Sequence, residues 1–305
     1  MTYVTKCNLH PWRETTLLLF GTAIFIQCGH MDAAIIRTGA FFSILTIMAV
    51  AEYYAPRRRL RLGRRRWPTN LAIVVLDALI VRLLLPGGAI AAAVWADAQH
   101  IGLFHYLVWN EAIAVIAVVM LLDLAIYAQH VLFHSVPILW RLHLVHHADG
   151  DIDVTTGLRF HPLEILLSML IKIALVVLLG APVLAVMIFE VVLNAMAMFN
   201  HANVYLPEKL DRWLRLLVVT PDVHRIHHSV IKAETNSNFG FNLSIWDRLF
   251  GTWQEQPQHG HDHMVIGLEH LQSAPTHRLG YMLRLPFTRH IGQYPMLQRK
   301  GGRDE

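Results

Sequence analysis

The sequence predicts an all-α membrane protein, built as a polytopic bundle of spanning helices with histidine clusters gathered on one side. The first observation is composition: 54% of the 305 residues are hydrophobic and only 16% are charged. Soluble domains carry about 25% charged residues, so this balance indicates a membrane protein. The second is a series of long apolar runs, and the third is the presence of 20 histidines, half of which fall in short clusters between His130 and His228.

The apolar runs define the expected spans, since about 20 apolar residues are needed to cross a bilayer. They lie at residues 15–28, 33–51, 71–95, 112–127 and 163–199. We interpret the first as an uncleaved anchor, because no small-residue cleavage site follows it. The third is interrupted at residues 86–88, so it is either one broken span or a span with an interfacial piece. The last is split at residues 180–182 and is typical of a helical hairpin that crosses the membrane or dips into it.

A basic loop between the second and third runs predicts the topology. It contains seven arginines, Arg57, Arg58, Arg59, Arg61, Arg64, Arg65 and Arg66. Between two apolar spans such a run is a cytoplasmic-side signal rather than a nucleic-acid site. Counting crossings from this loop puts every histidine cluster between His130 and His228 on the same side. We therefore expect a multi-pass protein with these clusters and both termini in the cytoplasm.

Three histidine clusters have the spacing of metal ligands on helices. His130 and His134 stand four residues apart, and an HxxHH pattern occurs twice, as His143, His146 and His147 and as His224, His227 and His228. Residues three and four apart share one helical face, and imidazole suits iron, copper, nickel and zinc. Eight rings are enough for two metal ions, and burying so many rings near apolar surface is costly unless they bind something.

Other histidines leave alternatives open. His161 and His201 are single residues at span ends, where either an interfacial polar role or a ligand role fits. His259, His261 and His263 alternate with other residues in a loop-like stretch, which we expect to be a solvated, non-catalytic tail.

Several other functions are excluded by missing motifs. No histidine is followed by glutamate as in the HExxH helix of zinc proteases. Asp149, Asp151 and Asp153 resemble the start of a calcium loop, but Val154 and Phe160 occupy its required glycine and glutamate positions. The chain also lacks a dinucleotide fingerprint, a phosphate loop and a haem motif, so electrons for any redox chemistry must come from a separate protein.

Taken together, the motifs resemble the fatty acid hydroxylase and sterol desaturase superfamily over about residues 110–255. The resemblance rests on the three histidine clusters and on TGLRFHPLE (156–164), FNHAN (199–203), TPDVHRIHHS (220–229), NFG (238–240) and IWDRLFGT (245–252). It implies a cytosolic histidine-rich cap that holds two non-haem iron ions, with O₂, a lipid from the bilayer and an electron-donor protein as partners. The eight clustered histidines are then the iron ligands, as is often the residue matching His201, while His161 is either a ligand or a neighbour of one.

The same resemblance points to residues that would orient the ligands, namely Arg159, Glu164, Asp222, Asn238 and Asp247. For these five, ordinary capping or loop ion pairs are equally good explanations. We expect a transmembrane region at 1–105, a catalytic domain at 106–255 and a cytoplasmic tail at 256–305. A compact N-terminus and a short tail without a lysine-rich signal are typical of a bacterial member in the inner membrane.

The predicted function is O₂-dependent hydroxylation or desaturation of a lipid C–H bond. The alternative is a histidine-rich metal transporter or metal-binding membrane protein, although transport sites usually lie at mid-membrane on broken helices. The sequence alone separates neither the two oxidation outcomes nor the possible lipids.

Overall fold

The computed structural model of the protein describes residues 35–107, 110–289 and 292–297, so the predicted first span at 15–28 lies outside the described residues. Within those ranges the all-α prediction is confirmed. The chain there forms helices with no strand, and its β-type pairing is limited to isolated bridges such as that between Pro56 and Val204.

Five helical segments of the described chain are long and apolar enough to cross a membrane. They are Ile35–Tyr54, Gly63–Tyr106, Glu111–Ser135 (α5), Pro162–Leu179 (α7) and Val183–His201 (α8). At 1.5 Å per residue, α7 and α8 are each about 27 Å long, close to the thickness of the hydrocarbon core. The predicted hairpin at 163–199 is therefore long enough for two full crossings. It turns at Gly180, whose φ of 63° ends α7 in a left-handed conformation.

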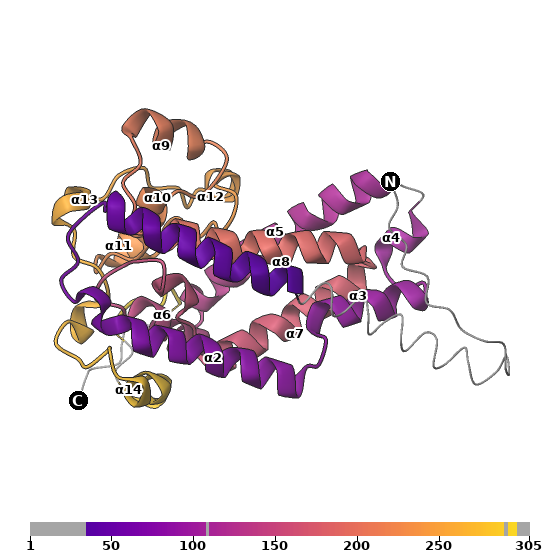
Figure 1. The fold of residues 1–305 in the computed structure, drawn as a ribbon, viewed down its shortest axis with the longest axis horizontal. Helices are drawn as coiled ribbons and strands as arrows, with labels where there is room; N and C mark the ends of the chain where they lie inside the picture. Colours follow the sequence, from indigo (N-terminus) through magenta and orange to yellow (C-terminus); the bar gives the residue numbers. More distant parts are fainter. Residues whose placement is uncertain (1–34, 108–109, 290–291, 298–305) are drawn as a thin grey trace, which may run out of the picture.

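The second segment is a broken span. Its helices are α2 (Trp67–Leu84), α3 (Gly88–Ala98) and the short α4 (Leu103–Tyr106). Gly87 and Gly88 adopt φ values of 80° and 53°, which glycine tolerates best, and they bend the chain between α2 and α3. Figure 1 shows α3 continuing beyond the end of α2, and both helices pack against α7.

Small and branched side chains form the core between the spanning helices. Ala93 of α3, Val118 of α5, Val176 of α7 and Ala185 of α8 are all fully buried in one cluster. Small residues allow helix backbones to approach closely in a membrane, where the hydrophobic effect does not drive association. Large apolar side chains such as Leu79 point outward instead, as expected for a lipid-facing surface.

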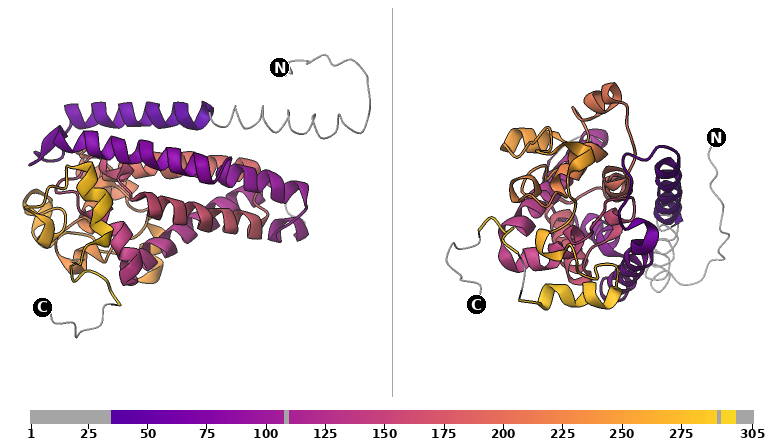
Figure 2. Two further views of the ribbon diagram at one scale, coloured as in Figure 1. Left: turned by 90° about the horizontal axis from the view of Figure 1, so that it is seen from below. Right: turned by 90° about the vertical axis from the view of Figure 1, so that its left-hand side faces the viewer.

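One buried carboxylate ties three of the spans together. Glu190 of α8 is 2% exposed and lies between Arg37 (3.1 Å) of the Ile35–Tyr54 helix and Lys172 (3.2 Å) of α7. An unpaired charge at this depth would be costly, so the contacts stabilise the arrangement of these helices. Figure 2 shows the Ile35–Tyr54 helix, in indigo, at the edge of the bundle beside α2.

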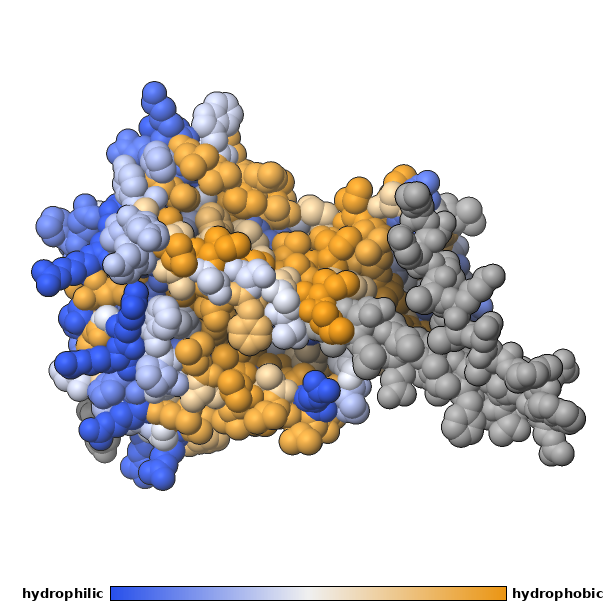
Figure 3. Space-filling view, in the orientation of Figure 1, coloured by the Kyte–Doolittle hydropathy of each residue, from blue (hydrophilic) through white to orange (hydrophobic). Residues whose placement is uncertain are grey.

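The shorter helices gather at one end of the bundle and form a cap, residues 136–161 and 202–289. The cap contains α6 (Pro137–His147), η2 (Thr156–Leu158), α9 (Glu208–Leu214), α10 (Pro221–His227), α11 (Lys232–Thr235), α12 (Ile245–Phe250), α13 (Gly260–His263), η3 (Glu269–Leu271), α14 (Leu279–Arg284) and η4 (Leu285–Phe287). Hydrophilic side chains concentrate at this end, and hydrophobic ones cover the spanning helices (Figure 3).

The arginine loop is joined to the cap. Arg66, at the end of η1 (Gly63–Arg66), is fully buried and pairs with Asp149 and Asp153 of the cap. The aspartates that resembled a calcium loop thus have an arginine as their cationic partner. Arg57 bonds Asp222 at 3.2 Å, and Arg58 donates to the carbonyl oxygen of Met264 at 2.8 Å. The basic loop and the cap therefore lie at the same end of the bundle.

The stretch expected to be a solvated tail is partly buried. His261 is only 9% exposed and lies 3.8 Å from Asp222, so the expectation was wrong for this residue, although His259 and His263 are exposed. Met282 and Leu285 pack with Trp140 in a buried cluster. The apolar residues between the C-terminal histidines and residue 289 explain this folding back, because they provide surface that the cap can bury.

Replacing Arg66 with glutamine should destabilise the protein strongly. The substitution leaves two buried aspartates without their cation, a change that typically costs about 3–5 kcal/mol. We expect the apparent melting temperature in detergent to fall by roughly 10 °C. The matched control is Arg65→Gln, since Arg65 is exposed next to it. Equal melting temperatures for the two variants would contradict the role assigned to Arg66.

Candidate metal centre

Nine buried histidines form two groups, in each of which the potential ligand atoms lie within 4.8 Å of one another. The first group consists of His130, His134, His143, His147 and His227. The second group consists of His146, His201, His224 and His228. All eight clustered histidines and His201 are therefore brought together, whereas His161 belongs to neither group.

Four helices supply these side chains. His130 and His134 lie in the last two turns of α5, and His201 is the last residue of α8. The two HxxHH patterns end α6 and α10, and each of them serves both groups. In α6, His143 and His147 face the first group while His146 faces the second, as expected when residues four apart share a helical face.

The outward-facing ring nitrogens bond fixed acceptors. The Nδ1 atoms lie 2.8 Å from the Phe239 carbonyl oxygen (His130), 2.6 Å from Glu164 Oε1 (His143), 3.2 Å from the Arg159 carbonyl oxygen (His146), 2.7 Å from the Ala197 carbonyl oxygen (His201) and 2.7 Å from the Ser237 carbonyl oxygen (His227). His134 Nδ1 similarly lies 3.2 Å from Asn236 Oδ1. Carbonyl and carboxylate oxygens only accept, so each Nδ1 carries the proton and donates it, and each Nε2 presents a lone pair inward.

These inward lone pairs face one another at short range. The Nε2 atoms of His130 and His143 are 3.1 Å apart, and those of His146 and His201 are 3.0 Å apart. With both protons on Nδ1, neither pair can form a hydrogen bond, and the facing lone pairs repel. Two nitrogens bound to one ion at about 2.1 Å and at right angles are about 3 Å apart. The donor set therefore fits a metal ion in each group.

Burial keeps the rings in the neutral form that binds metals. The pKa values of the cap histidines lie well below the usual histidine value, because burial disfavours the charged ring and the neighbouring rings repel a proton. The histidines concerned are His143, His146, His147, His224, His227 and His228. Several of their ring nitrogens, including His227 Nε2, have no hydrogen-bond partner among the described residues.

Two of the five predicted orienting residues contact a grouped histidine directly. Glu164, in the first turn of α7, accepts a hydrogen bond from His143 Nδ1. Arg159 accepts one from His146 Nδ1 through its main-chain carbonyl. The Arg159 guanidinium is buried and donates to Asn70 Oδ1 at 2.8 Å. A carboxylate on the second nitrogen of a ligand fixes the ring orientation and makes it more basic.

The other three orienting candidates hold the backbone around the ligands. Asp247 accepts the amide protons of Phe239 (2.7 Å) and Gly240 (2.8 Å), which fixes the carbonyl that meets His130. Asn238 has a φ of 51° and donates to the Val223 and Gln254 carbonyls. Asp222 pairs with Arg225 and Arg57 at the start of α10.

His161 has a different environment. It is the N-cap of α7, where its Nδ1 accepts the amide proton of Leu163 at 3.2 Å. Its Nε2 lies 3.3 Å from the Leu283 carbonyl oxygen. Burial lowers its pKa, so the ring is neutral and acts as a cap.

Sequence reasoning missed several groups that orient the rings. These groups lie in residues 236–239 (NSNF), which overlap the NFG motif at 238–240. They are the side chain of Asn236 and the carbonyls of Ser237 and Phe239. Carbonyl groups carry no residue signature, so only the concentration of small polar residues there could have drawn attention. Apolar rings complete the walls: Phe160 stacks on His146 with ring centroids 4.3 Å apart, and Trp140 packs against His134.

Comparison with known proteins identifies the part of the chain that carries this centre. Residues 115–252 match the model of the fatty acid hydroxylase family. The chain is 34% identical over 150 residues to an ornithine lipid hydroxylase of Rhizobium tropici, covering 49% of this chain and 44% of that protein. It is 31% identical to the human alkylglycerol monooxygenase, covering 48% of this chain and 31% of that protein. A rat cholesterol 25-hydroxylase is 27% identical, covering 47% of each chain.

The chain therefore spans less than half the length of these relatives, and the aligned regions cover about half of this chain. No solved structure gives a significant match. The predicted resemblance to the superfamily is confirmed by the family match and by these relatives.

Removing one ligand from either group should lower the bound metal. We expect His134→Ala and His224→Ala each to reduce the metal content from about two ions per chain to one or fewer, as measured by elemental mass spectrometry of purified protein. The discriminating control is His161→Ala, which should keep both ions because this ring lies outside both groups. Unchanged content in the first two variants would refute the ligand assignment.

Glu164→Gln should weaken metal binding without abolishing it. The amide oxygen can still accept from His143, but the negative charge that makes the ring a stronger ligand is lost. Changes of this kind typically cost about 10–100-fold in metal affinity. Competition with a graded series of chelators would measure the change, and Glu111→Gln, at the far end of α5, is the control. Identical chelator curves for both variants would show that the carboxylate has no influence.

Proposed function

We propose that the protein is a membrane-bound oxygenase that holds two iron ions and hydroxylates a lipid, because its residues 115–252 match the fatty acid hydroxylase family. The observation that carries this proposal is the pair of buried histidine groups with inward Nε2 atoms. In this proposal, the nine grouped histidines are the ligands and His161 is not.

We propose iron rather than another metal because the ligand chemistry and the family match both agree with it. Imidazole also suits zinc, copper and nickel, so the ligands alone do not select iron. When bound, the two iron ions would supply the activation of O₂ and the attack on an unactivated C–H bond, which no amino-acid side chain can perform. The hydroxylase and monooxygenase relatives favour this use of the site over transport of the metal.

The protein's own residues would orient the ligands and exclude water. The hydrogen bonds from Nδ1 would fix six of the nine rings before the ions bind, those of His130, His134, His143, His146, His201 and His227, which limits the reorganisation that binding requires. Phe160, Trp140 and Phe239 surround the rings with apolar surface. A dry, rigid setting prevents reactive species from escaping into side reactions with water.

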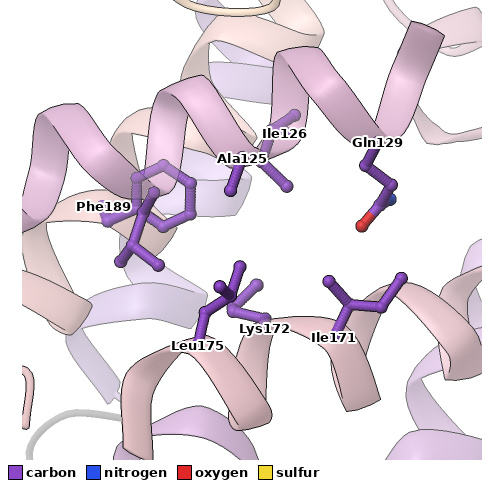
Figure 4. A pocket seen from close by; sticks show the side chains of 8 residues that line it. Ala125, Ile126, Gln129, Ile171, Lys172, Leu175 and Phe189 are labelled. Carbon is purple, nitrogen blue, oxygen red and sulfur yellow. The ribbon is translucent and has the colours of Figure 1, made fainter. Parts of the chain in front are cut away.

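The lipid would reach the centre from the bilayer between α5 and α7. A small recess opens there, lined by residues of α5, α7 and α8. Figure 4 shows Ala125, Ile126 and Gln129 of α5 facing Ile171, Lys172 and Leu175 of α7. Most of the lining is apolar, as an acyl or alkyl chain requires, and Gln129 directly precedes the ligand His130.

The depth of the centre points to the part of the lipid that reacts. His130, His134 and His201 lie at the ends of spanning helices, on the cap side of the apolar region. A lipid whose chain occupies the pocket would bring carbons near its polar headgroup to the ions. We therefore propose a polar membrane lipid as substrate, in line with the ornithine lipid and alkylglycerol named for two relatives.

The reaction would combine R–H, O₂, two electrons and two protons to give R–OH and water. Hydroxylation is preferred to desaturation because the relatives described above are named as hydroxylases or monooxygenases. The electrons would come from a separate donor protein. We place the cap in the cytoplasm because the arginine loop lies at the same end, and basic loops are retained on that side. Residues 106–255 would form the catalytic domain, and the other parts would support it.

Expression in a heterologous host should change the host lipids in a defined way. We expect a lipid heavier by one oxygen atom, detected by lipid mass spectrometry, together with about two iron ions in each purified chain. The control is the His134→Ala variant, which should be inserted in the membrane but should not form this product. A lipid lighter by two hydrogen atoms would instead identify the reaction as desaturation. If the lipid profile is unchanged although the host supplies an electron-donor protein and each chain holds two iron ions, the proposed activity is wrong.

A further inference from the structure

The surface formed by α9 and α12 is unusually apolar for a part of the cap. Its large exposed side chains include Trp213 (74% exposed), Leu217 (66%) and Leu249 (64%). We define the α9–α12 face by the residues Leu210, Trp213, Leu216, Leu217, Ile245, Leu249 and Phe250, all of which are exposed. An apolar patch of this extent marks an interaction surface rather than ordinary variation.

The segment at α9 buries one charged pair while it exposes large apolar side chains. Its polar residues Asp211 and Arg215 are buried and pair with each other across one turn, while Leu210 and Trp213 point outward. The Arg215 carbonyl accepts from Ser244 at 2.8 Å and from Arg248 at 3.1 Å, which ties α9 to the start of α12. Glu208, Lys209 and Arg212 are also exposed in α9. An exposed surface that combines charged and large apolar side chains suits the boundary of a membrane better than it suits water alone.

The α9–α12 face lies beside a spanning helix. Trp246 donates to Asp123 of α5 at 2.8 Å, and the Phe250 ring stacks on Tyr127 with centroids 5.3 Å apart. Along α5, Asp123 and Tyr127 precede His130 by about 10 Å and 5 Å towards the middle of the span. Figure 3 shows that apolar side chains near α12 run into the apolar surface of the spanning helices.

We propose that the α9–α12 face is immersed in the membrane, at the boundary between headgroups and acyl chains on the side of the metal centre. Its continuity with the lipid-facing surface of α5 selects the bilayer as the occupant. The charges at its rim agree, because Lys209, Arg212 and Arg248 are exposed and can reach lipid phosphates while their stems stay in apolar surroundings. Trp213 suits the same boundary, where indole rings concentrate in membrane proteins.

Spin labels at single cysteines in lipid nanodiscs test the proposal. Cys7 and Cys28 are first replaced by serine, and labels are attached in Trp213→Cys and Leu249→Cys. Leu79→Cys, on the outer side of α2, gives the lipid reference, and Gln258→Cys, exposed in the cap, gives the water reference. Collision with O₂ reports the apolar phase, and collision with a water-soluble nickel complex reports water. Melting curves confirm that each labelled variant is folded.

The expected result is a ratio of O₂ to nickel collisions at positions 213 and 249 that is several-fold higher than at 258 and approaches that at 79. Ratios equal to that at position 258 would show the face in water and overturn the proposal. Protection from both reagents would also overturn it, because the face would then be covered by protein, such as a second copy of the chain. The measurement requires neither metal nor activity, so it is independent of the proposed reaction.

Discussion

The structure depends on one electrostatic constraint, the need to satisfy a set of imidazole lone pairs that point at one another in a buried space. Each ring has two nitrogens, and donating a proton from one leaves a lone pair on the other. In this protein the donors point outward to Phe239, Glu164, Arg159, Ala197 and Ser237, so the lone pairs must point inward. Bound metal ions would relieve their repulsion, and the surrounding loops and helix ends hold the outward acceptors in position.

That constraint explains why glycine is needed in two segments that contain no histidine of the centre. The backbone at Phe239 and Gly240 is bound by Asp247, and Gly240 has no room for a side chain, since an added Cβ would lie 2.6 Å from Asp247 Oδ2. Gly157 is similar, because a Cβ there would lie 2.2 Å from the Ala197 carbonyl oxygen that orients His201. Glycine permits close approach of the backbone at both places.

The parts of this arrangement that follow from local spacing could be predicted from the sequence. The i, i+3, i+4 positions of His143, His146 and His147 predicted a shared helical surface, and the apolar runs predicted the spans. Contacts between side chains far apart in sequence could not be predicted, because neither the charge of a residue nor its spacing shows which distant residue it meets. In the sequence, Arg66 is one of seven arginines in the loop that indicates the topology. In the structure it is buried and pairs with Asp149 and Asp153. For the same reason the burial of His261 was missed, and His161 could not be separated from the true members of the groups.

The two HxxHH helices have a consequence for how the centre assembles. Because α6 and α10 each contribute rings to both groups, the rotation and position of these helices cannot be adjusted for one group alone. An ion in the first group would fix His143, His147 and His227, and it would thereby place His146, His224 and His228 for the second. By thermodynamic reciprocity, whatever effect the first ion has on the affinity for the second, the second has on the affinity for the first. The two groups would therefore be coupled, so that the loading of one changes the affinity of the other.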